Sequence, residues 1–245
     1  CNPHGDLARY GDTSSQRIIL LPEITNDKGL AMTGSFTSML LCGLLVSRIG
    51  DMPNLEPLIN TIIQCGEYIL KNHVTKLKGV SEMEFSRAVF LGSGPFKGIA
   101  SESHLKLQEL TLGNIICKYD SFLGLRHGPK AVLDKNTLIV YLFSNDKYVQ
   151  KFEKDLAKEI HEQKLGKYSM GIYDQYSDID YFDTGINMGN ETNGIDEEFL
   201  TLCYILPAQI LAYYSSRKLG LDPDNPSESG IITRVVRGVN IYSYP

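Results

Sequence analysis

The chain has 245 residues, of which 42% are hydrophobic and 22% charged, so it is long enough to bury a sizeable core and has the composition of an ordinary globular protein. Its formal net charge is −5 and its lysines and arginines are dispersed, which excludes the basic stripe by which proteins bind nucleic acid. The longest apolar run, Met39 to Val46, is far shorter than the roughly 20 residues of a membrane-spanning helix.

The cysteines and the acidic residues show no pattern of a metal site. The cysteines lie far apart, mostly in apolar surroundings, and indicate reduced thiols of a cytosolic protein (Cys1, Cys42, Cys65, Cys117 and Cys203). The acidic segment from Tyr173 to Gly185 lacks the ligand order and the closing glutamate of a calcium-binding loop. We also find no signal-peptide pattern. We therefore expect a cytoplasmic protein with no metal, no cofactor and no membrane partner.

The first predicted elements are a strand and a helix. Arg17 to Pro22 (RIILLP) is a short aliphatic run after a polar cluster, which is typical of a buried parallel strand. Phe36 to Ser47 is almost entirely apolar and predicts a buried helix. Thr33 and Ser35 stand where this helix begins. Hydroxyls and free backbone N–H groups at that place hold an anion or, as the commoner use, cap the helix.

Two helices follow, over Leu55 to Asn72 and Lys76 to Glu84, and we expect them to join two α/β units. Ala88 to Leu91 is then a buried strand, Gly92 to Pro95 a glycine turn and Ile99 to Leu112 a helix. This arrangement is typical of α/β folds that bind nucleotides or phosphate. GSGP lacks the complete GxGxxG pattern, however, and is weak evidence by itself.

The rest of the chain continues the alternation of strand and helix. Short apolar runs predict strands and longer stretches with an apolar face predict helices (strands over 115–119, 136–144, 169–173 and 186–189; helices over 147–164 and 199–219). The alternation predicts an α/β fold with a parallel sheet.

Three ionisable side chains are candidates for catalysis. Lys106 and Glu109 are three residues apart on one face of the predicted helix, a spacing that an ordinary ion pair also explains. His127 lies in a Gly/Pro turn (RHGP), where it is held stiffly, although a satisfied loop histidine is the plainer interpretation. Isomerisation of an aldose to a ketose needs a base beside the carbonyl and a group that moves protons on the sugar oxygens. Glu109 suits the first role and His127 the second, while Lys106 can stabilise an enediolate oxygen.

At these residues the chain resembles a known family. FLGSG, KLQELT and HGP are similar to the second sugar isomerase (SIS) domain of glucosamine-6-phosphate synthase. TNDKGLAMTGSFTSM, DSFLGLRHGPK and RVVRGVNIY are similar to bacterial relatives of that enzyme, the galactosamine-6-phosphate deaminase/isomerases, also labelled tagatose-6-phosphate ketose/aldose isomerases. The resemblance covers nearly the whole chain, and its motifs are specific when they are taken together.

The resemblance implies a fold of tandem SIS domains, each a flavodoxin-like parallel sheet flanked by helices, with the first domain present only in part. Residues 1–50 then end the first domain, 51–86 form a helical connector, 87–225 form the second domain and 226–245 form a tail that closes over the site. The family's phosphate-binding loops would precede Cys1, so we expect the chain to begin inside the first domain.

The resemblance also implies roles for single residues. Glu109 corresponds to the base, and Lys106 to the lysine of the same motif. His127 corresponds to the histidine that opens the sugar ring and comes from the neighbouring subunit, which implies a homodimer or a higher homo-oligomer.

Three further residues are implied to bind the substrate. Ala31 and Thr33 correspond to the segment that lines the sugar, and Ser229 to the closing tail. The synthase carries a lysine near the end of this tail, whereas here the nearest basic side chain is that of Arg234.

The leading hypothesis is therefore an aldose–ketose isomerase, also deaminating, that acts on an amino-hexose phosphate such as galactosamine 6-phosphate. A non-catalytic SIS module that binds sugar phosphates and regulates a partner is the alternative, since the fold also serves as a binding unit. An NAD-dependent enzyme ranks last, because the GSG turn lacks the third glycine and the predicted strand over 115–119 does not end on an acidic residue.

Overall fold

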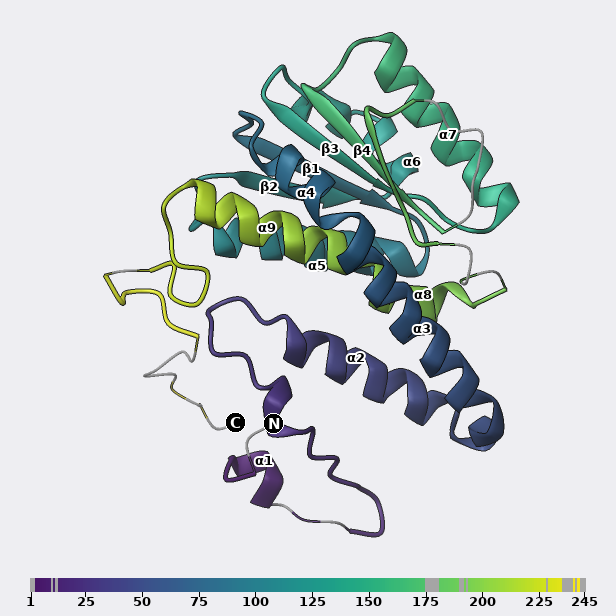
Figure 1. Cartoon of the computed structure of the whole chain (residues 1–245), viewed down its shortest axis with the longest axis vertical. Coiled ribbons are helices and arrows are strands. Elements are labelled where there is room, and N and C mark those ends of the chain that lie inside the picture. Colours follow the sequence, from purple (N-terminus) through teal and green to yellow (C-terminus); the bar gives the residue numbers. More distant parts are fainter. Residues whose placement is uncertain are drawn as a thin grey trace.

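The computed structural model describes residues 3–9, 11, 13–174, 181–189, 192, 194–227, 229–234, 240 and 242. Its centre is a sheet of five parallel strands in the order β2-β1-β3-β4-β5 (Figure 1). This is the order of flavodoxin-like folds, and it confirms the predicted α/β class. The strands are β1 (Arg87–Gly92), β2 (Ile116–Asp120), β3 (Thr137–Leu142), β4 (Tyr168–Tyr173) and β5 (Thr184–Asn187).

The two central strands form from the most apolar runs of the chain. All of β3 is buried, and so is β1 apart from Arg87, because helices cover both faces of the sheet at this place. Successive side chains of a strand point to opposite faces. Ala88 and Phe90 therefore belong to one hydrophobic core, and Val89 and Leu91 to a second. The sheet separates these two cores.

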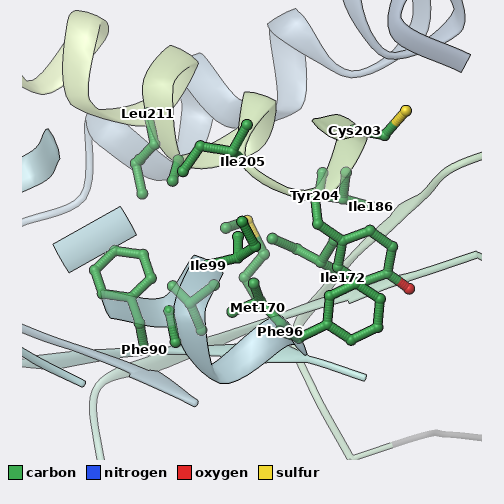
Figure 2. Close-up of a cluster of buried hydrophobic side chains, with 14 of the residues drawn as sticks. Phe90, Phe96, Ile99, Met170, Ile172, Ile186, Cys203, Tyr204, Ile205 and Leu211 are labelled. Atoms are coloured by element: carbon green, nitrogen blue, oxygen red, sulfur yellow. The ribbon is translucent and has the colours of Figure 1, made fainter. Parts of the chain in front are cut away.

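The larger core lies between the sheet and a layer of helices. Phe96 and Tyr204 come from two of these helices and stack with their ring centroids 4.0 Å apart (Figure 2). The buried hydroxyl of Tyr204 donates a hydrogen bond to the carbonyl oxygen of Phe143 at 3.0 Å. The helices of this layer are α3 (Met52–Asn72), α4 (Val74–Ser81), α5 (Pro95–Leu110), α8 (Glu197–Tyr204) and α9 (Leu206–Lys218).

The second core lies under two helices on the other face. Phe122 and Leu125 from α6 (Phe122–Arg126) and Leu156 from α7 (Lys147–Glu162) pack against Ile139 of the sheet. The side chain of Asp146 caps α7 by accepting hydrogen bonds from two backbone N–H groups. The remaining elements are α1 (Asp6–Arg9), α2 (Gly34–Ser47), η1 (Glu23–Thr25), η2 (Ile49–Asp51) and η3 (Pro129–Val132).

Two expectations for the first part of the chain are wrong. Residues 17–22 form no strand, and Ile19 and Leu20 are 57% and 52% exposed. Helix α2 forms as predicted but is not buried, since Ser35 is its single buried residue. A strand needs a neighbour for its backbone hydrogen bonds, and within the described residues the sheet offers none to this segment.

The predicted helix over 199–219 is two helices. The chain breaks at Ile205, and Pro207 occupies the first turn of α9, where a proline is tolerated. The stretch Glu197–Lys218 is apolar and long enough to cross a membrane by composition, but 72% of its most apolar window is buried inside the protein. This degree of burial is typical of core helices in folded proteins. The acidic segment from Tyr173 to Gly185 lies partly outside the described residues, at 175–180.

Candidate active site

Helix α5 brings Lys106 and Glu109 together and adds a second carboxylate. The Lys106 ammonium lies 3.1 Å from the Glu109 carboxylate and 3.0 Å from that of Glu102. The spacings of three and four residues put these side chains on one helix face, one turn apart. Lys106 is only 3% exposed, Glu102 16% and Glu109 37%. The group therefore has one inner cation and two carboxylates, of which Glu109 is the more accessible.

The burial of Lys106 explains why it needs both partners. A charge taken out of water is tolerated only when it is paired and hydrogen-bonded, and removal of one partner of a buried pair costs about 3–5 kcal/mol. Two carboxylates and one ammonium leave a net charge of about −1 on the group. The ion pair that the sequence spacing predicted is confirmed, and Glu102 is its unpredicted member.

A cavity of about 400 Å³ lies beside the end of α5. Ala31 and Thr33, the two residues expected to line a sugar, both line it, and so does Leu110, which follows Glu109 in the chain. Within the part of the chain that the structure describes, the lining includes neither Lys106 nor Glu109. The other walls come from the loop before α2, from α3, α4 and α9, and from the loop after α9 (Asp27, Lys28, Gly29, Leu70, Val74, Gln209, Ile210, Tyr213, Tyr214, Pro223 and Asp224).

The start of α2 is held by the protein's own carboxylate. Asp27 accepts five hydrogen bonds of 2.6 to 3.0 Å, from the backbone N–H groups of Thr33, Gly34 and Ser35 and from two hydroxyls. Partial burial alone would raise the pKa of Asp27, but the hydrogen bonds from Ser35, Thr33 and Gly34 outweigh it and lower the pKa to about 2. Thr33 occupies the N-cap position of α2, as expected, but the carboxylate of Asp27 accepts the hydrogen bonds of the free N–H groups in place of a Thr33 or Ser35 hydroxyl.

The tail approaches the same loop. A side chain at Gly29 would come within 3.1 Å of the Pro223 carbonyl oxygen, so the two backbones lie close together. Arg234 donates a hydrogen bond to the side-chain oxygen of Asn26 at 2.8 Å. Ser229 lies between these two contacts along the chain and is exposed. Figure 1 shows the tail, in yellow, on the side of the molecule where the N-terminal segment lies.

His127 lies apart from Lys106 and Glu109. It follows α6 and is exposed. Helix α6 belongs to the second core, whereas α5 belongs to the first, so the sheet stands between the histidine and the other two side chains. The structure thus brings two of the three candidate catalytic residues together within one chain.

The glycine turn after β1 faces carboxylates. A side chain at Gly94 would lie 3.7 Å from the Glu197 carboxylate. Glu197 also accepts a hydrogen bond from the N–H of Asn145 at 2.9 Å. Glu153 is fully buried nearby, and this burial, with a smaller effect of the Glu197 charge, raises the pKa of Glu153 to about 7. Carboxylates at this place repel a phosphate, which argues against the dinucleotide-binding alternative.

Some residues of the site were not recognised in the sequence. The i,i+4 spacing of Glu102 and Lys106 was a readable signal for an ion pair. Asp27 carries no comparable signal in the sequence, because its role depends on a loop that folds back onto α2. Gln209 lines the cavity from a helix whose sequence carries no signal for it.

The sheet order defines an α/β protein of flavodoxin-like topology, which carries the paired Lys106 and Glu109 on α5 and a cavity beside the end of that helix. No family model matches the chain. The chain is, however, similar over its whole length to D-galactosamine-6-phosphate deaminase AgaS of Shewanella sp. (strain ANA-3), with 37% identity over 245 residues that cover 59% of that relative.

Solved structures extend this similarity. A crystal structure from Clostridium novyi NT has a TM-score of 0.93 and 42% identity, over 100% of this chain and 63% of that chain. Tagatose-6-phosphate ketose/aldose isomerase from Escherichia coli has a TM-score of 0.84 and 30% identity, over 95% of this chain and 62% of that chain. The resemblance to the SIS family is confirmed. The chain spans only 59% to 63% of the length of these relatives.

Proposed function

We propose that this chain carries the proton-transfer group of an aldose–ketose isomerase, also deaminating, that converts an amino-hexose phosphate such as galactosamine 6-phosphate into tagatose 6-phosphate. The observation that supports it best is the accessible Glu109 carboxylate on the buried Lys106, next in the chain to a residue of the cavity that Ala31 and Thr33 line. The similarity to relatives named for these two reactions supports the choice of substrate.

In the proposed reaction, Glu109 takes the proton from C2 of the open-chain amino sugar, and the electron pair forms an enolamine. A proton returned to C1 gives an imine at C2. Water then adds to the imine, which releases ammonia and leaves the ketose. Carboxylates act as bases of this kind when they are positioned and partly shielded from water.

Lys106 has the supporting role. A cation held 3.1 Å from the Glu109 carboxylate fixes the position of that carboxylate and favours negative charge that develops nearby. A buried, doubly paired lysine does not change partners freely, which keeps the reacting geometry constant. Lys106 therefore orients the base and stabilises the enediolate-like oxygen in this proposal.

His127 opens the sugar ring from a neighbouring subunit. Its position after α6, across the sheet from Glu109, supports an active site shared between two copies of the chain. The exposure of His127 leaves it free to reach a second copy. We propose a homodimer or a higher homo-oligomer on this ground.

One observation favours a second candidate function, a non-catalytic module that binds sugar phosphates and regulates a partner. Glu109 is already engaged by Lys106, and the described lining of the cavity does not include it. A binding module needs the cavity but not the carboxylate. This candidate predicts that sugar phosphates stabilise the protein and that no product forms.

The test compares Glu109→Gln with the unchanged complete protein and with Glu162→Gln, a matched change of an exposed glutamate on α7. Ammonia release and ketose formation from galactosamine 6-phosphate are measured on the same samples, together with binding of the sugar phosphate. We expect Glu109→Gln to lose turnover by about 10³-fold or more while it still binds. Retained turnover would overturn the assignment, and binding without turnover in the unchanged protein would favour the second candidate.

A further inference from the structure

Apolar side chains stand exposed around β2, the strand at one edge of the sheet. Within the described part of the chain, β2 pairs with β1 alone. Ile116 and Tyr119 of this strand are 65% and 38% exposed, although isoleucine is among the residues most often buried. Leu105 of α5 and Leu123 of α6 are 37% and 47% exposed. We call these four side chains the β2 surface, and exposed apolar groups gathered in one place mark sites of interaction.

Helix α5 borders this surface on one face of the sheet. The ring of His104 on α5 lies 4.8 Å from the ring of Tyr119, measured between centroids. Leu105 follows His104 in the chain. The spacing of four residues puts Leu105 and Glu109 on the same side of the helix, one turn apart. Glu109 therefore lies at one border of the β2 surface.

Helix α6 borders the surface on the other face of the sheet. It begins at Phe122, two residues after β2 ends. Leu123 and His127 are again four residues apart, and both are exposed. Each of the two candidate catalytic residues thus has an exposed leucine about one turn before it, and β2 lies between them.

The polar groups at this edge are already engaged within the chain. The backbone N–H of Cys117 donates a hydrogen bond to the side-chain oxygen of Gln108 at 3.2 Å, so this part of the edge does not accept a further strand. Lys118 forms an ion pair with Asp120 at 3.3 Å. The edge therefore suits a partner that packs on its side chains, and it carries no unpaired charge of one sign that would repel an identical surface.

A second copy of the chain is the partner that this arrangement favours. Glu109 and His127 lie on opposite faces of one sheet, and the proposed reaction needs both. In a twofold dimer the same surface of each copy meets the other, so a single contact forms two identical sites. The apolar surface that would hold the copies together lies between the two residues that they would share.

We propose that a second copy of this chain docks on the β2 surface, so that His127 of the partner subunit approaches Glu109. The inference rests on the proposed function for its choice of partner. It assigns the contact between subunits to Leu105, Ile116, Tyr119 and Leu123.

The experiment measures association and turnover of the complete protein with Ile116→Lys. We expect the dissociation constant of the dimer, measured by analytical ultracentrifugation, to rise at least about 30-fold, because an unpaired ammonium is buried in each half of the contact. Ammonia release per subunit should fall at low protein concentration and recover as the concentration rises and dimers form again. Ile63→Lys is the matched control, since Ile63 on α3 is 52% exposed, and it should change neither quantity.

Leu123→Lys, on the other face of the sheet, is the second variant and should act in the same way. If both variants associate as the unchanged protein does, or if the unchanged protein is a monomer, the inference is wrong. It is also wrong if the variants lower the free energy of unfolding of the isolated subunit and leave association unchanged, because another part of the complete chain then covers the surface.

These outcomes separate the inference from the proposed function. If Ile116→Lys dissociates the unchanged dimer but neither protein forms product, the proposed function fails and the contact stands. If the unchanged protein forms product and Ile116→Lys remains a fully active dimer at all concentrations, only the inference fails.

Discussion

At the scale of single residues, charged side chains of the chain itself occupy the places where a bound anion was one expectation. The carboxylate of Asp27 occupies the start of α2, where an external anion was one of the two expectations. Lys106 is satisfied by two carboxylates of its own helix. The glycine turn after β1 faces Glu197 with Glu153 behind it. A helix start or a glycine turn in the sequence is therefore no evidence for a bound phosphate here.

Glu153 makes the stability of the protein depend on pH. Burial raises the pKa of this carboxyl from 4.5 to about 7, so the folded protein keeps a proton that the unfolded chain has already lost. The stabilisation that comes from the protonated Glu153 carboxyl is fully present below pH about 4.5 and is lost as the pH rises through about 7. We expect the free energy of unfolding of Glu153→Gln, relative to that of the unchanged protein, to rise by up to roughly 3 kcal/mol between pH 4 and pH 8.

Urea unfolding of the variant and of the unchanged protein at a series of pH values measures this change in the difference of their unfolding free energies. Glu162→Gln, the same substitution at an exposed position of the same helix, is the control. A constant difference for Glu153→Gln across this range would show that Glu153 is not protonated in the folded protein.

At the scale of elements, the approach of α5 to β1 depends on the first glycine of the turn. A Cβ atom at Gly92 would lie 2.3 Å from the carbonyl oxygen of Phe96 in the first turn of the helix. Gly94 has φ +51°, a conformation that side chains other than glycine rarely adopt. The two glycines therefore set how closely the helix of Lys106 and Glu109 packs on the sheet. Their role here is in packing.

A pair of glycine substitutions in this region tests that interpretation. Gly92→Ala should lower the free energy of unfolding by about 1–3 kcal/mol, because the backbone must move to admit the methyl group. Gly98→Ala is the matched control inside α5, where a Cβ atom meets nothing within 4 Å, and it should raise the free energy by roughly 0.5–1 kcal/mol. Urea unfolding of both variants measures the two effects, and equal effects would contradict the close approach at Gly92.

At the scale of the whole molecule, the sheet divides the candidate catalytic residues. Helix α5 packs on one face and α6 on the other, so Glu109 and His127 belong to different sides of one chain. We propose that a site that uses both residues is built from two copies of the chain. This is the physical basis for the proposed homo-oligomer.

Mixed subunits test the shared site. Glu109→Gln and His127→Asn are each expected to abolish turnover alone. In mixed dimers one site receives both changes and the other receives neither, so random mixing of equal amounts should restore about one quarter of the unchanged activity. The measurement is ammonia release after the two inactive proteins are unfolded and refolded together. Activity that stays at zero while mixed dimers form would contradict a site shared between subunits.

Much of the fold was predictable because its signals are local. The run at 88–91 and the middle of the run at 136–144 are continuously hydrophobic, as strands covered on both faces must be. The stretch from Lys147 is helical because its apolar side chains recur at helical spacing. The strand expected over 17–22 failed because a strand also needs a neighbour, which no property of its own residues supplies.

The sequence by itself determined the class of fold, the ion pair of Lys106 with Glu109 and the resemblance to the SIS family, because helical spacing and short motifs are properties of neighbouring residues. Only the tertiary structure decided that the Asp27 carboxylate binds the start of α2, that Gln209 lines the cavity of Ala31 and Thr33, and that the sheet separates His127 from Glu109. These relations join residues far apart in the chain. Packing of helices on the two faces of the sheet creates them, and spacing along the chain does not encode them.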